Sequence, residues 1–277
     1  MGAGNRQGEC PTGREETMNK NVLTIAGFDP SGCAGLITDL KTLMAWRMYG
    51  IGVITAITAQ NTQRVDSVYP APLEVIGSQL ESIVADIQIH AVKIGMMPNA
   101  QTLDLVAELC KEFHLPNIVV DPVLRSSTGY QFADDKMIAA YKEKLFPLAE
   151  AVTPNLEEAS VFADMDVKDV VGMKSAAERI LRFGPKNVVV TGGHLDMRAM
   201  DVHYDGIRHT VFDAPKVASQ NTRGLGCTFS SILAVHLARK LKVQSAIDPA
   251  KKYIARAMVH PFKIGKGNGP LNHNVAI

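Results

Sequence analysis

Short runs of Val, Ile and Ala alternate with longer stretches of helical periodicity, and this alternation constrains the fold more than any other feature. The apolar runs lie at residues 22–26, 52–56, 91–94, 118–120, 151–153 and 187–191. They lack a strict apolar–polar alternation, which is typical of strands buried on both faces of a parallel sheet. The helical stretches lie at residues 35–47, 73–86, 100–113, 134–145, 156–163 and 173–182. This order predicts a three-layer α/β fold with helices on both faces of a mostly parallel central sheet.

The last third of the chain departs from this rhythm. Residues 199–204 and 207–212 flank Asp205 and Gly206, which predicts a β-hairpin with a tight turn. A glycine-rich turn follows, and then helices are predicted at 227–240 and 245–259. Because no linker, repeat or low-complexity block interrupts residues 22–273, one domain is expected over residues 19–277, with a flexible tail at residues 1–18.

Composition argues against several classes of function. The 277 residues carry 29 Lys and Arg against 28 Asp and Glu, and this net charge of +1 without a basic cluster argues against nucleic-acid binding. No apolar run approaches the roughly 20 residues that a membrane span requires. The four cysteines show neither a CxxC pair nor zinc-site spacing, and there is no secretory apolar segment. A reduced, cytoplasmic protein is therefore expected.

Polar and glycine-rich clusters follow the predicted strands. They are GFDPSG at 27–32, QNT at 60–62, DP at 121–122, TPN at 153–155 and GGH at 192–194. The carboxyl ends of parallel strands meet at one edge of the sheet, where open α/β sheets bind ligands. These clusters therefore predict an active site at that edge.

The first cluster lacks the two familiar phosphate-binding motifs. Gly27 and Gly32 have the spacing of a P-loop, but Cys33 and Ala34 follow where Lys and Ser or Thr are required. The glycines also lack the spacing of a dinucleotide-binding turn. A tight turn between strand and helix accounts for these glycines by itself.

The segment NTRGLGCT at 221–228 combines a glycine-rich turn with the start of a helix. The first N–H groups of that helix would point at one spot and hold a phosphate or a developing negative charge. Cys227 would lie at the helix N-terminus, a position that lowers the pKa of a thiol. The alternative is an ordinary capped turn with a buried cysteine.

The segment TPNLEE at 153–158 places Asn155 and Glu158 three residues apart on the opening turn of a helix. Side chains at this spacing face the same way and would hold a hydrated Mg²⁺ beside nucleotide phosphates. The same pair fits a capping box, with Asn155 as the N-cap and Glu158 completing it. Taken alone, the segment favours the cap.

Together these motifs resemble the hydroxymethylpyrimidine/phosphomethylpyrimidine kinases, thiamin-pathway enzymes with a ribokinase-like fold. The matching segments are IAGFDPSG at 25–32, DLKT at 39–42, TAITAQNT at 55–62, KIGM at 93–96, DPV at 121–123, TPNLEE at 153–158, GGHL at 192–195, GLGCT at 224–228 and GPLNH at 269–273. They follow the family's order from about residue 22 to residue 273, so the resemblance covers most of the chain.

The resemblance implies that ATP and Mg²⁺ serve as cofactors. It implies transfer of the γ-phosphoryl group to the hydroxymethyl group of 4-amino-5-hydroxymethyl-2-methylpyrimidine, and then a second phosphorylation that makes the pyrophosphate. It also implies a substrate pocket in which Gln60 hydrogen-bonds the aminopyrimidine. The other residues implied to shape that pocket are Gly27, Asp39, Met96 and Val123.

The resemblance also implies roles on the phosphate side of the site. The amides of Gly224, Leu225 and Gly226 would form an anion hole, and Cys227 would occupy the position where sugar kinases of the superfamily carry an aspartate base. The residues implied to serve the nucleotide and Mg²⁺ are Asn155, Thr191 and Gly193 for the nucleotide, and Glu158 and Asp121 for the metal.

The chain departs from the family pattern at four places. It has RGLGC at 223–227 where HGTGC is usual, SSTG at 126–129 where AKSG is usual, Thr191 in place of a lysine and Cys33 in place of a glycine. Two lysines are thereby lost near the nucleotide, which weakens the expectation of the second phosphorylation more than that of the first. Arg125 and Arg223 are the candidates to restore positive charge there.

Two other functions fit parts of the same pattern. The nearest alternative is a pyridoxal kinase of the same superfamily. Gln60 distinguishes a pyrimidine kinase from it, because an amide offers a donor and an acceptor to an aminopyrimidine, whereas B6-type relatives carry Met at this position. A pyrimidine-binding module without catalytic activity is the other. The presence of Cys227, Asn155 and Glu158 favours an active kinase. A homodimer is expected because dimers are common in the superfamily.

Overall fold

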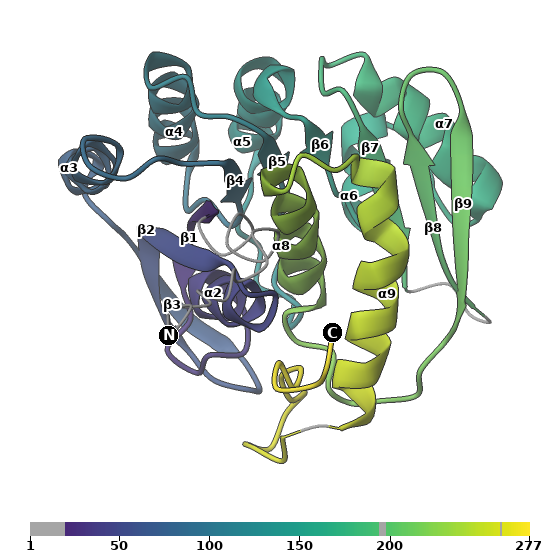
Figure 1. Cartoon of the computed structure of the whole chain (residues 1–277). Helices are drawn as coiled ribbons and strands as arrows, with labels where there is room; N and C mark the ends of the chain where they lie inside the picture. The colour runs from purple at the N-terminus through teal and green to yellow at the C-terminus, as the bar shows by residue number, and fades with distance from the viewer. Residues whose placement is uncertain (1–19, 194–197, 261) are drawn as a thin grey trace, which may run out of the picture.

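The computed structural model describes residues 20–193, 198–260 and 262–277. These residues form one nine-stranded sheet with helices packed on both faces, which confirms the predicted three-layer fold (Figure 1). The tail expected at residues 1–18 lies outside the described residues, and so does His194 of the GGH cluster.

The strand order in the sheet is β3-β2-β1-β4-β5-β6-β7-β8-β9. The neighbours from β2 through β1, β4, β5 and β6 to β7 are parallel, and antiparallel strands lie at both edges. The strands are β1 (Asn21–Phe28), β2 (Tyr49–Gln60), β3 (Val65–Pro70), β4 (Ala91–Ile94), β5 (Ile118–Val120), β6 (Ala151–Val152), β7 (Val188–Gly192), β8 (Arg198–Tyr204) and β9 (His209–Pro215). The hairpin predicted around Asp205 and Gly206 is therefore confirmed as β8 and β9.

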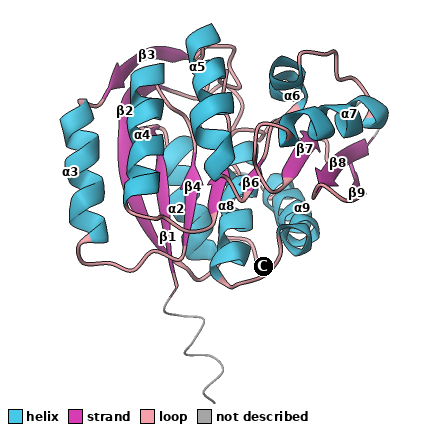
Figure 2. Ribbon diagram, turned by 90° about the horizontal axis from the view of Figure 1, so that it is seen from above, coloured by secondary structure: helices cyan, strands magenta, loops and turns pink. Residues whose placement is uncertain are grey.

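Helices cover the two faces of the sheet as separate layers (Figure 2). One layer consists of α3 (Leu73–Val84), α4 (Ala100–Glu112), α5 (Asp135–Ala140), α6 (Leu156–Ala163) and α7 (Val170–Leu181). The other consists of α2 (Gly35–Ala45), α8 (Leu225–Ala238) and α9 (Val243–Val259). A strand has a side-chain period of two, so in β1 Leu23 and Ile25 pack into one core and Val22 into the other. The predicted strands lack alternation because both faces of the sheet are buried.

Two elements differ from the prediction. Strand β2 continues to Gln60, and β3 pairs with it as an edge strand that the sequence pattern did not indicate. An edge strand has only one neighbour and tolerates Pro and polar residues, so the segment VDSVYP lacks the apolar signal of the central strands. The helix expected at 134–145 is α5, and it continues as a π-helical turn (Tyr141–Leu145) and a 3-10 turn (Phe146–Leu148).

Candidate active site

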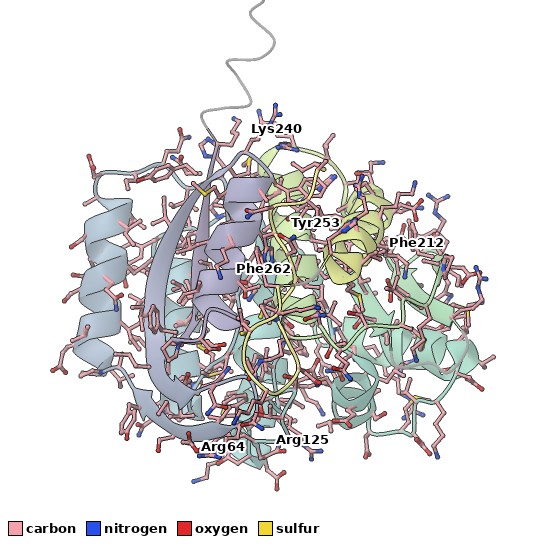
Figure 3. All side chains as sticks on the ribbon, turned by 90° about the horizontal axis from the view of Figure 1, so that it is seen from below. Arg64, Arg125, Phe212, Lys240, Tyr253 and Phe262 are labelled. Carbon is pink, nitrogen blue, oxygen red and sulfur yellow. The ribbon has the colours of Figure 1, made fainter. Side chains whose placement is uncertain are left out.

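The carboxyl edge of the sheet gathers the segments that were predicted to form the site. Arg64, which follows β2, and Arg125, which follows β5, lie at this edge, and Lys240 lies at the opposite one (Figure 3). Gly27 and Met96 are in such close contact that a Cβ on Gly27 would lie 2.2 Å from the Met96 Cε. The amino end of α8 also reaches this edge, because a Cβ on Gly226 would lie 3.6 Å from both carboxylate oxygens of Asp121.

The turn before α8 requires glycine at position 224. Gly224 has a φ of +79°, and a Cβ there would lie 2.6 Å from the carbonyl oxygen of Cys33 and 3.0 Å from the Thr38 Cγ2. No side chain caps α8, which begins at Leu225. The first N–H groups of a helix have no partner within the helix, so this uncapped end is suited to an anion.

Cys227 lies in the first turn of α8, with its side chain half-buried. Burial raises the pKa of its thiol to about 12; Lys93 lowers this pKa, Asp39 and Asp121 raise it, and a hydrogen bond from the Gly35 backbone lowers it. The expectation that the helix terminus gives a low thiol pKa is therefore wrong for the free protein. Desolvation and two nearby carboxylates outweigh the terminus, so the thiol is protonated at neutral pH.

A buried ion pair lies beneath the thiol. The Lys93 Nζ is 2.9 Å from the Asp39 Oδ2 and 3.8 Å from the Asp121 Oδ2. Burial lowers the pKa of Lys93, but Asp39, Cys227 and Asp121 raise it, with a net rise. Burial also raises the pKa of Asp121, against the influence of Lys93. Lys93 was not predicted as a site residue, although a lysine inside the apolar strand AVKI was the signal for it.

Asp39 is completely buried, and its carboxylate is bound by groups of the protein itself. Its Oδ2 accepts hydrogen bonds from the Thr24 hydroxyl at 2.6 Å and from Lys93, and its Oδ1 accepts one from the Ser231 hydroxyl at 3.1 Å. Asp39 therefore joins β1, β4 and α8 beneath the site through these hydrogen bonds. Its predicted contact with substrate remains a prediction.

Asn155 and Glu158 form the capping box at the start of α6. The Asn155 Oδ1 accepts from the Glu158 N–H at 3.0 Å, and the Glu158 Oε2 accepts from the Asn155 N–H at 2.9 Å. The pKa of Glu158 is raised to about 8: burial and the nearby Asp121 raise it, and hydrogen bonds from the Asn155 and Leu124 backbones oppose the rise. At neutral pH the buried carboxyl group of Glu158 is therefore protonated, with Asp121 nearby.

The residues predicted for Mg²⁺ have suitable chemistry. Among the residues that the structure describes, no three His, Cys, Asp or Glu side chains are grouped to hold a metal ion by themselves. Mg²⁺ in kinases is bound by one or two carboxylates and by substrate phosphates, with water completing its shell. Asp121 raises the pKa of Glu158, and a divalent cation near these carboxyl groups would relieve that repulsion. Asp121 and Glu158 therefore fit the ion as partial ligands.

The segments predicted for the nucleotide lie next to one another. Asn155 and Thr191 form an isolated β-bridge, and the Thr191 N–H donates to the Pro154 carbonyl at 2.9 Å. The Gly192 N–H donates to the Asp201 Oδ1 at 3.0 Å, which fixes the end of β7. Gly193 follows and is exposed.

Two of the residues predicted for the pyrimidine lie at or after strand ends. Gln60, at the end of β2, and Val123, after β5, are both half-buried. Arg223 was expected to offer positive charge to phosphates, and this expectation is wrong because its side chain is only 1% exposed and pairs with Asp29. Arg125 is half-exposed and lies 3.8 Å from Glu157.

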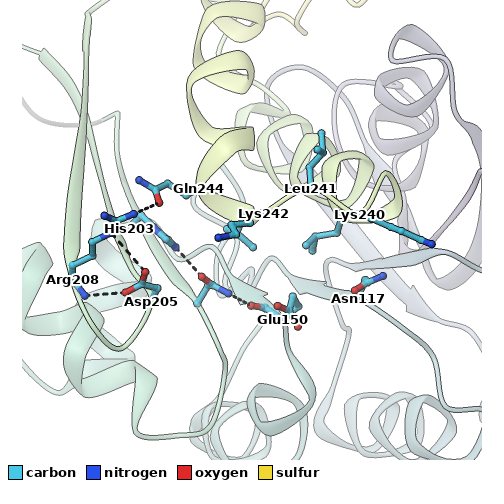
Figure 4. A pocket seen from close by; sticks show the side chains of 12 residues that line it. Asn117, Glu150, His203, Asp205, Arg208, Lys240, Leu241, Lys242 and Gln244 are labelled. Carbon is cyan, nitrogen blue, oxygen red and sulfur yellow. Dashed lines mark hydrogen bonds and ion pairs between the residues drawn. The ribbon is translucent and has the colours of Figure 1, made fainter. Parts of the chain in front are cut away.

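One hollow in the described part of the chain lies away from these residues. It measures about 460 Å³ and is lined at the amino edge of the sheet by side chains that include Asn117, Glu150, His203 and Lys240 (Figure 4). None of the predicted site residues lines it. Separately, no helix in the described residues is both long and apolar enough to cross a membrane.

Known proteins resemble the chain over nearly its whole length. The family model described as phosphomethylpyrimidine kinase matches residues 29–272. The hydroxymethylpyrimidine/phosphomethylpyrimidine kinase of Haemophilus influenzae is 38% identical over 92% of this chain and 96% of its own length. The thiamine biosynthesis bifunctional protein ThiED of Geobacter sulfurreducens is 38% identical over 98% of this chain, which spans 54% of that longer relative.

A solved structure shows the same fold. The ADP complex of Bacillus subtilis pyridoxal kinase has a TM-score of 0.85 and 37% identity, covering 92% of this chain and 97% of that one. The three-layer fold, with an uncapped helix over buried carboxylates at its carboxyl edge, defines a small-molecule kinase of the ribokinase-like class. Within that class, the chain belongs to the phosphomethylpyrimidine kinase family.

Proposed function

We propose that this kinase phosphorylates 4-amino-5-hydroxymethyl-2-methylpyrimidine with MgATP, as a step of thiamin biosynthesis. The observation that carries the proposal is the uncapped amino end of α8, which begins at Leu225 and reaches Asp121 in a chain of this family. Phosphoryl transfer depends mostly on positioning and on stabilisation of charge. An uncapped helix end beside acidic metal ligands supplies both.

The amides at the start of α8 have the central role in this proposal. The N–H groups of Gly224, Leu225 and Gly226 would bind the oxygens of the transferring phosphoryl group, where they would lower the barrier by stabilising developing charge. The Cys227 thiol would lie beside the substrate hydroxyl. Because this thiol is protonated in the free protein, it can act as a base only after it loses its proton. A bound Mg²⁺ would favour that loss by lowering the thiol pKa, whereas negative phosphate charge would raise it.

Mg²⁺ would be held by Asp121 and Glu158 on the nucleotide side. When bound, the ion neutralises phosphate charge. Asn155, Thr191 and Gly193 would position the nucleotide, and the β-bridge between Asn155 and Thr191 places two of them together. Glu158→Gln is then expected to raise the Mg²⁺ concentration needed for half-maximal rate. An unchanged Mg²⁺ titration with a lower melting temperature would leave Glu158 as a cap alone.

The choice of pyrimidine over pyridoxal depends on Gln60. Its amide would donate to and accept from the aminopyrimidine edge, while Gly27, Met96 and Val123 form apolar walls. Gln60→Met should lower kcat/KM for the pyrimidine by about 10²-fold, from the cost of leaving a buried polar group unpaired. A structural neighbour is named a pyridoxal kinase, so this comparison matters.

The second phosphorylation, which converts the monophosphate to the pyrophosphate, is proposed at the same site. The chain carries Ser127 and Thr191 where lysines are usual, and Arg223 is paired with Asp29. Arg125, with its side chain half-exposed, remains the candidate cation for the added phosphate. We expect the second step to be slower than the first.

A phosphate-transfer assay tests the proposed function directly. Hydroxymethylpyrimidine, its monophosphate and pyridoxal are compared side by side with MgATP, and products are identified by mass spectrometry. We expect the highest kcat/KM for hydroxymethylpyrimidine. A higher value for pyridoxal would assign the chain to B6 metabolism, and no turnover of any of the three would favour a pyrimidine-binding module.

Assembly and location complete the proposal. We expect a homodimer, and the paired residues Ile57 on β2 and Tyr69 on β3 support it because each is more than half exposed at the edge of the sheet. Light scattering of the wild type and of Ile57→Asp tests this assembly. A reducing, cytoplasmic location is consistent with Cys33, Cys110 and Cys227 being free thiols.

A further inference from the structure

Among the described residues, Arg223 has the largest side chain that is less than 2% exposed. Its Nη1 donates to the Asn61 carbonyl oxygen at 3.0 Å, and its Nη2 lies 3.8 Å from the Asp29 Oδ2. An arginine is rarely buried to this extent unless it is paired. The planar guanidinium group therefore links two segments that are 32 residues apart, the turn after β1 and the turn after β2.

Each of the two linked turns is ordered by the residue that Arg223 contacts. Asp29 accepts hydrogen bonds from the N–H groups of Ser31 and Ala34, at 2.9 and 3.0 Å, and so shapes the turn after β1. The Asn61 Oδ1 accepts from the N–H groups of Gln63 and Arg64, and so shapes the turn after β2. The guanidinium group thus fixes the distance between two preformed turns.

The backbone of Arg223 contacts a third segment. Its N–H donates to the Gly269 carbonyl at 3.2 Å, within a bridge to Pro270. The same C-terminal segment also contacts the turn after β2, because the Gly267 N–H donates to the Thr62 Oγ1 at 3.1 Å. A Cβ on Gly267 would lie 2.0 Å from the Thr62 carbonyl oxygen. Arg223 and the C-terminal segment therefore contact the adjacent residues Asn61 and Thr62.

We infer that Arg223 is a positioning residue for the pyrimidine: it holds Asn61, and through it the adjacent Gln60, at the distance from the turn after β1 that the substrate requires. The inference rests on the proposed role of Gln60 in substrate binding. Arg223 itself is buried against Asp29 and Asn61, so it acts through the turn and not by contact with phosphate.

Arg223 makes the two contacts with two different nitrogens of its forked side chain. The guanidinium group presents separate N–H donors on Nη1 and Nη2, whereas a lysine has a single charged atom. Arg223→Lys should therefore keep the attraction to Asp29 and lose the ordered bond to Asn61. Arg223→Met removes both and leaves Asp29, which is 3% exposed, without its cationic partner.

Steady-state kinetics provide the first test. Arg223→Met should raise KM for hydroxymethylpyrimidine about tenfold or more and change kcat less than about threefold. The reason is that a misplaced binding turn weakens the binding of the substrate equally in the ground state and in the transition state. Arg223→Lys should show a smaller rise. Calorimetric titration of the pyrimidine should give the same change in Kd. A fall in kcat with unchanged KM and Kd would overturn the inference.

Arg239→Met is the control for loss of an arginine that bonds a backbone carbonyl; the Arg239 side chain is half-buried, whereas that of Arg223 is buried. Arg239 also donates to a backbone carbonyl, that of Trp46 at 2.6 Å, and its Nε, like that of Arg223, is buried without a hydrogen-bond partner in the described residues. It follows α8 at the opposite edge of the sheet. This variant should lower the melting temperature and leave KM unchanged. An equal rise of KM in both variants would reduce the role of Arg223 to general stability.

A double-mutant cycle with Gln60→Met separates this inference from the proposed function. If Arg223 acts through the turn that carries Gln60, the effects of Arg223→Met and Gln60→Met on KM are not additive, and Arg223→Met adds less than about twofold in the Gln60→Met background. Additive effects would overturn the inference. If Gln60→Met alone changes nothing, the role of Gln60 fails and the Arg223 inference is decided by hydrogen exchange.

Hydrogen exchange tests the turn without using activity. The amides of residues 61–67 should exchange at least about tenfold faster in Arg223→Met than in the wild type, while those of α9 should keep their rates. Arg223→Lys should lie between the two. Unchanged exchange at residues 61–67 in Arg223→Met would show that the guanidinium group does not hold the turn, and would overturn the inference.

Discussion

At the scale of single residues, the thiol of Cys227 lies near one cation and two carboxylates. The charges of these three side chains influence whether the thiol is protonated. Burial, Asp39 and Asp121 raise its pKa, and Lys93 lowers it. Lys93 is itself held by Asp39 at 2.9 Å, so much of its positive charge is already neutralised. To act as a base, the thiol must therefore lose its own proton before phosphoryl transfer, so that the thiolate can accept the proton of the substrate hydroxyl as the phosphoryl group is transferred.

Replacement of Cys227 tests the role of the base. Cys227→Ala should lower kcat by about 10²–10⁴-fold, the usual contribution of a positioned general base, with little change in the Kd of the pyrimidine. Cys227→Asp should keep part of the activity, because a carboxylate can accept the same proton. Both variants are measured by single-turnover kinetics and calorimetric titration.

Cys110→Ala is the control for these variants, because Cys110 is a buried thiol in α4 whose pKa burial raises to about 12. It should cost stability and leave kcat unchanged. If Cys227→Ala keeps nearly wild-type kcat, Cys227 is a packing residue and the amides of α8 are the catalytic element. Alkylation of Cys227 by iodoacetamide should also be slow at pH 7, since the protonated thiol is not the nucleophile.

Glu158 links stability to pH. Its pKa is about 8 in the folded chain, against an ordinary value of 4.5. The folded state therefore binds this proton more tightly than the unfolded state does, and the stabilising effect is present below about pH 4.5 and lost as pH rises to about 8. Glu158→Gln cannot ionise, so its melting temperature relative to the wild type should be higher at pH 8.5 than at pH 5.5.

Differential scanning calorimetry at several pH values measures this difference. Glu157→Gln is a control, because Glu157 is an exposed neighbour on the same turn. Its melting temperature should follow the wild type at each pH. A constant difference between Glu158→Gln and the wild type across this range would show that Glu158 ionises normally.

At the scale of elements, the turn into α8 combines a left-handed backbone at Gly224 with a close approach to the segment at Cys33. Gly224→Ala should destabilise the protein by about 1–2 kcal/mol from the positive φ alone, and more from the contact with Cys33. It should also lower kcat, because the amides of α8 would move. Urea denaturation and steady-state kinetics measure the two effects.

Gly77→Ala is the matched control for this change. Gly77 lies inside α3, where a Cβ would meet nothing within 4 Å. Alanine should stabilise the protein there by about 0.5–1 kcal/mol, because glycine in a helix loses more conformational entropy on folding. Kinetics of this variant should match the wild type. A similar loss of activity in both variants would argue against a special role for the α8 turn.

At the scale of the whole molecule, the site is assembled from the carboxyl ends of six parallel strands and the amino end of α8. Hydroxymethylpyrimidine at a hundred times its Kd should therefore stabilise the folded chain by about 2.7 kcal/mol. For a protein of this size, that corresponds to a rise in melting temperature of roughly 5–10 °C. Thermal unfolding by circular dichroism, with and without the pyrimidine, measures the shift.

Pyridoxal at the same concentration provides the comparison. It should give a smaller shift, because Gln60 is matched to an aminopyrimidine. Equal shifts would argue that Gln60 does not select the substrate. The absence of a shift with hydroxymethylpyrimidine would contradict binding of this substrate to the free protein.

Much of the fold was determined by local sequence. The central strands β4 and β5 were predicted with their observed bounds, because short runs rich in Val and Ile are typical of strands buried on both faces of a sheet, even with Lys93 inside β4. Helix α6 was predicted at residues 156–163, and its capping box could be recognised from Asn155 and Glu158, since a cap involves residues three apart in the chain. The order of motifs indicated the family.

The tertiary structure decided the remainder, because it depends on groups far apart in the chain. The pKa of Cys227 is set by desolvation and by Asp39 and Asp121, which outweigh the local effect of a helix end. Arg223 looks like a free cation in the sequence, and it becomes a buried link only because folding brings Asp29 and Asn61 to it. Local patterns determine elements and their ends, whereas charge states and long-range contacts arise only when several strand ends meet at one edge of the sheet.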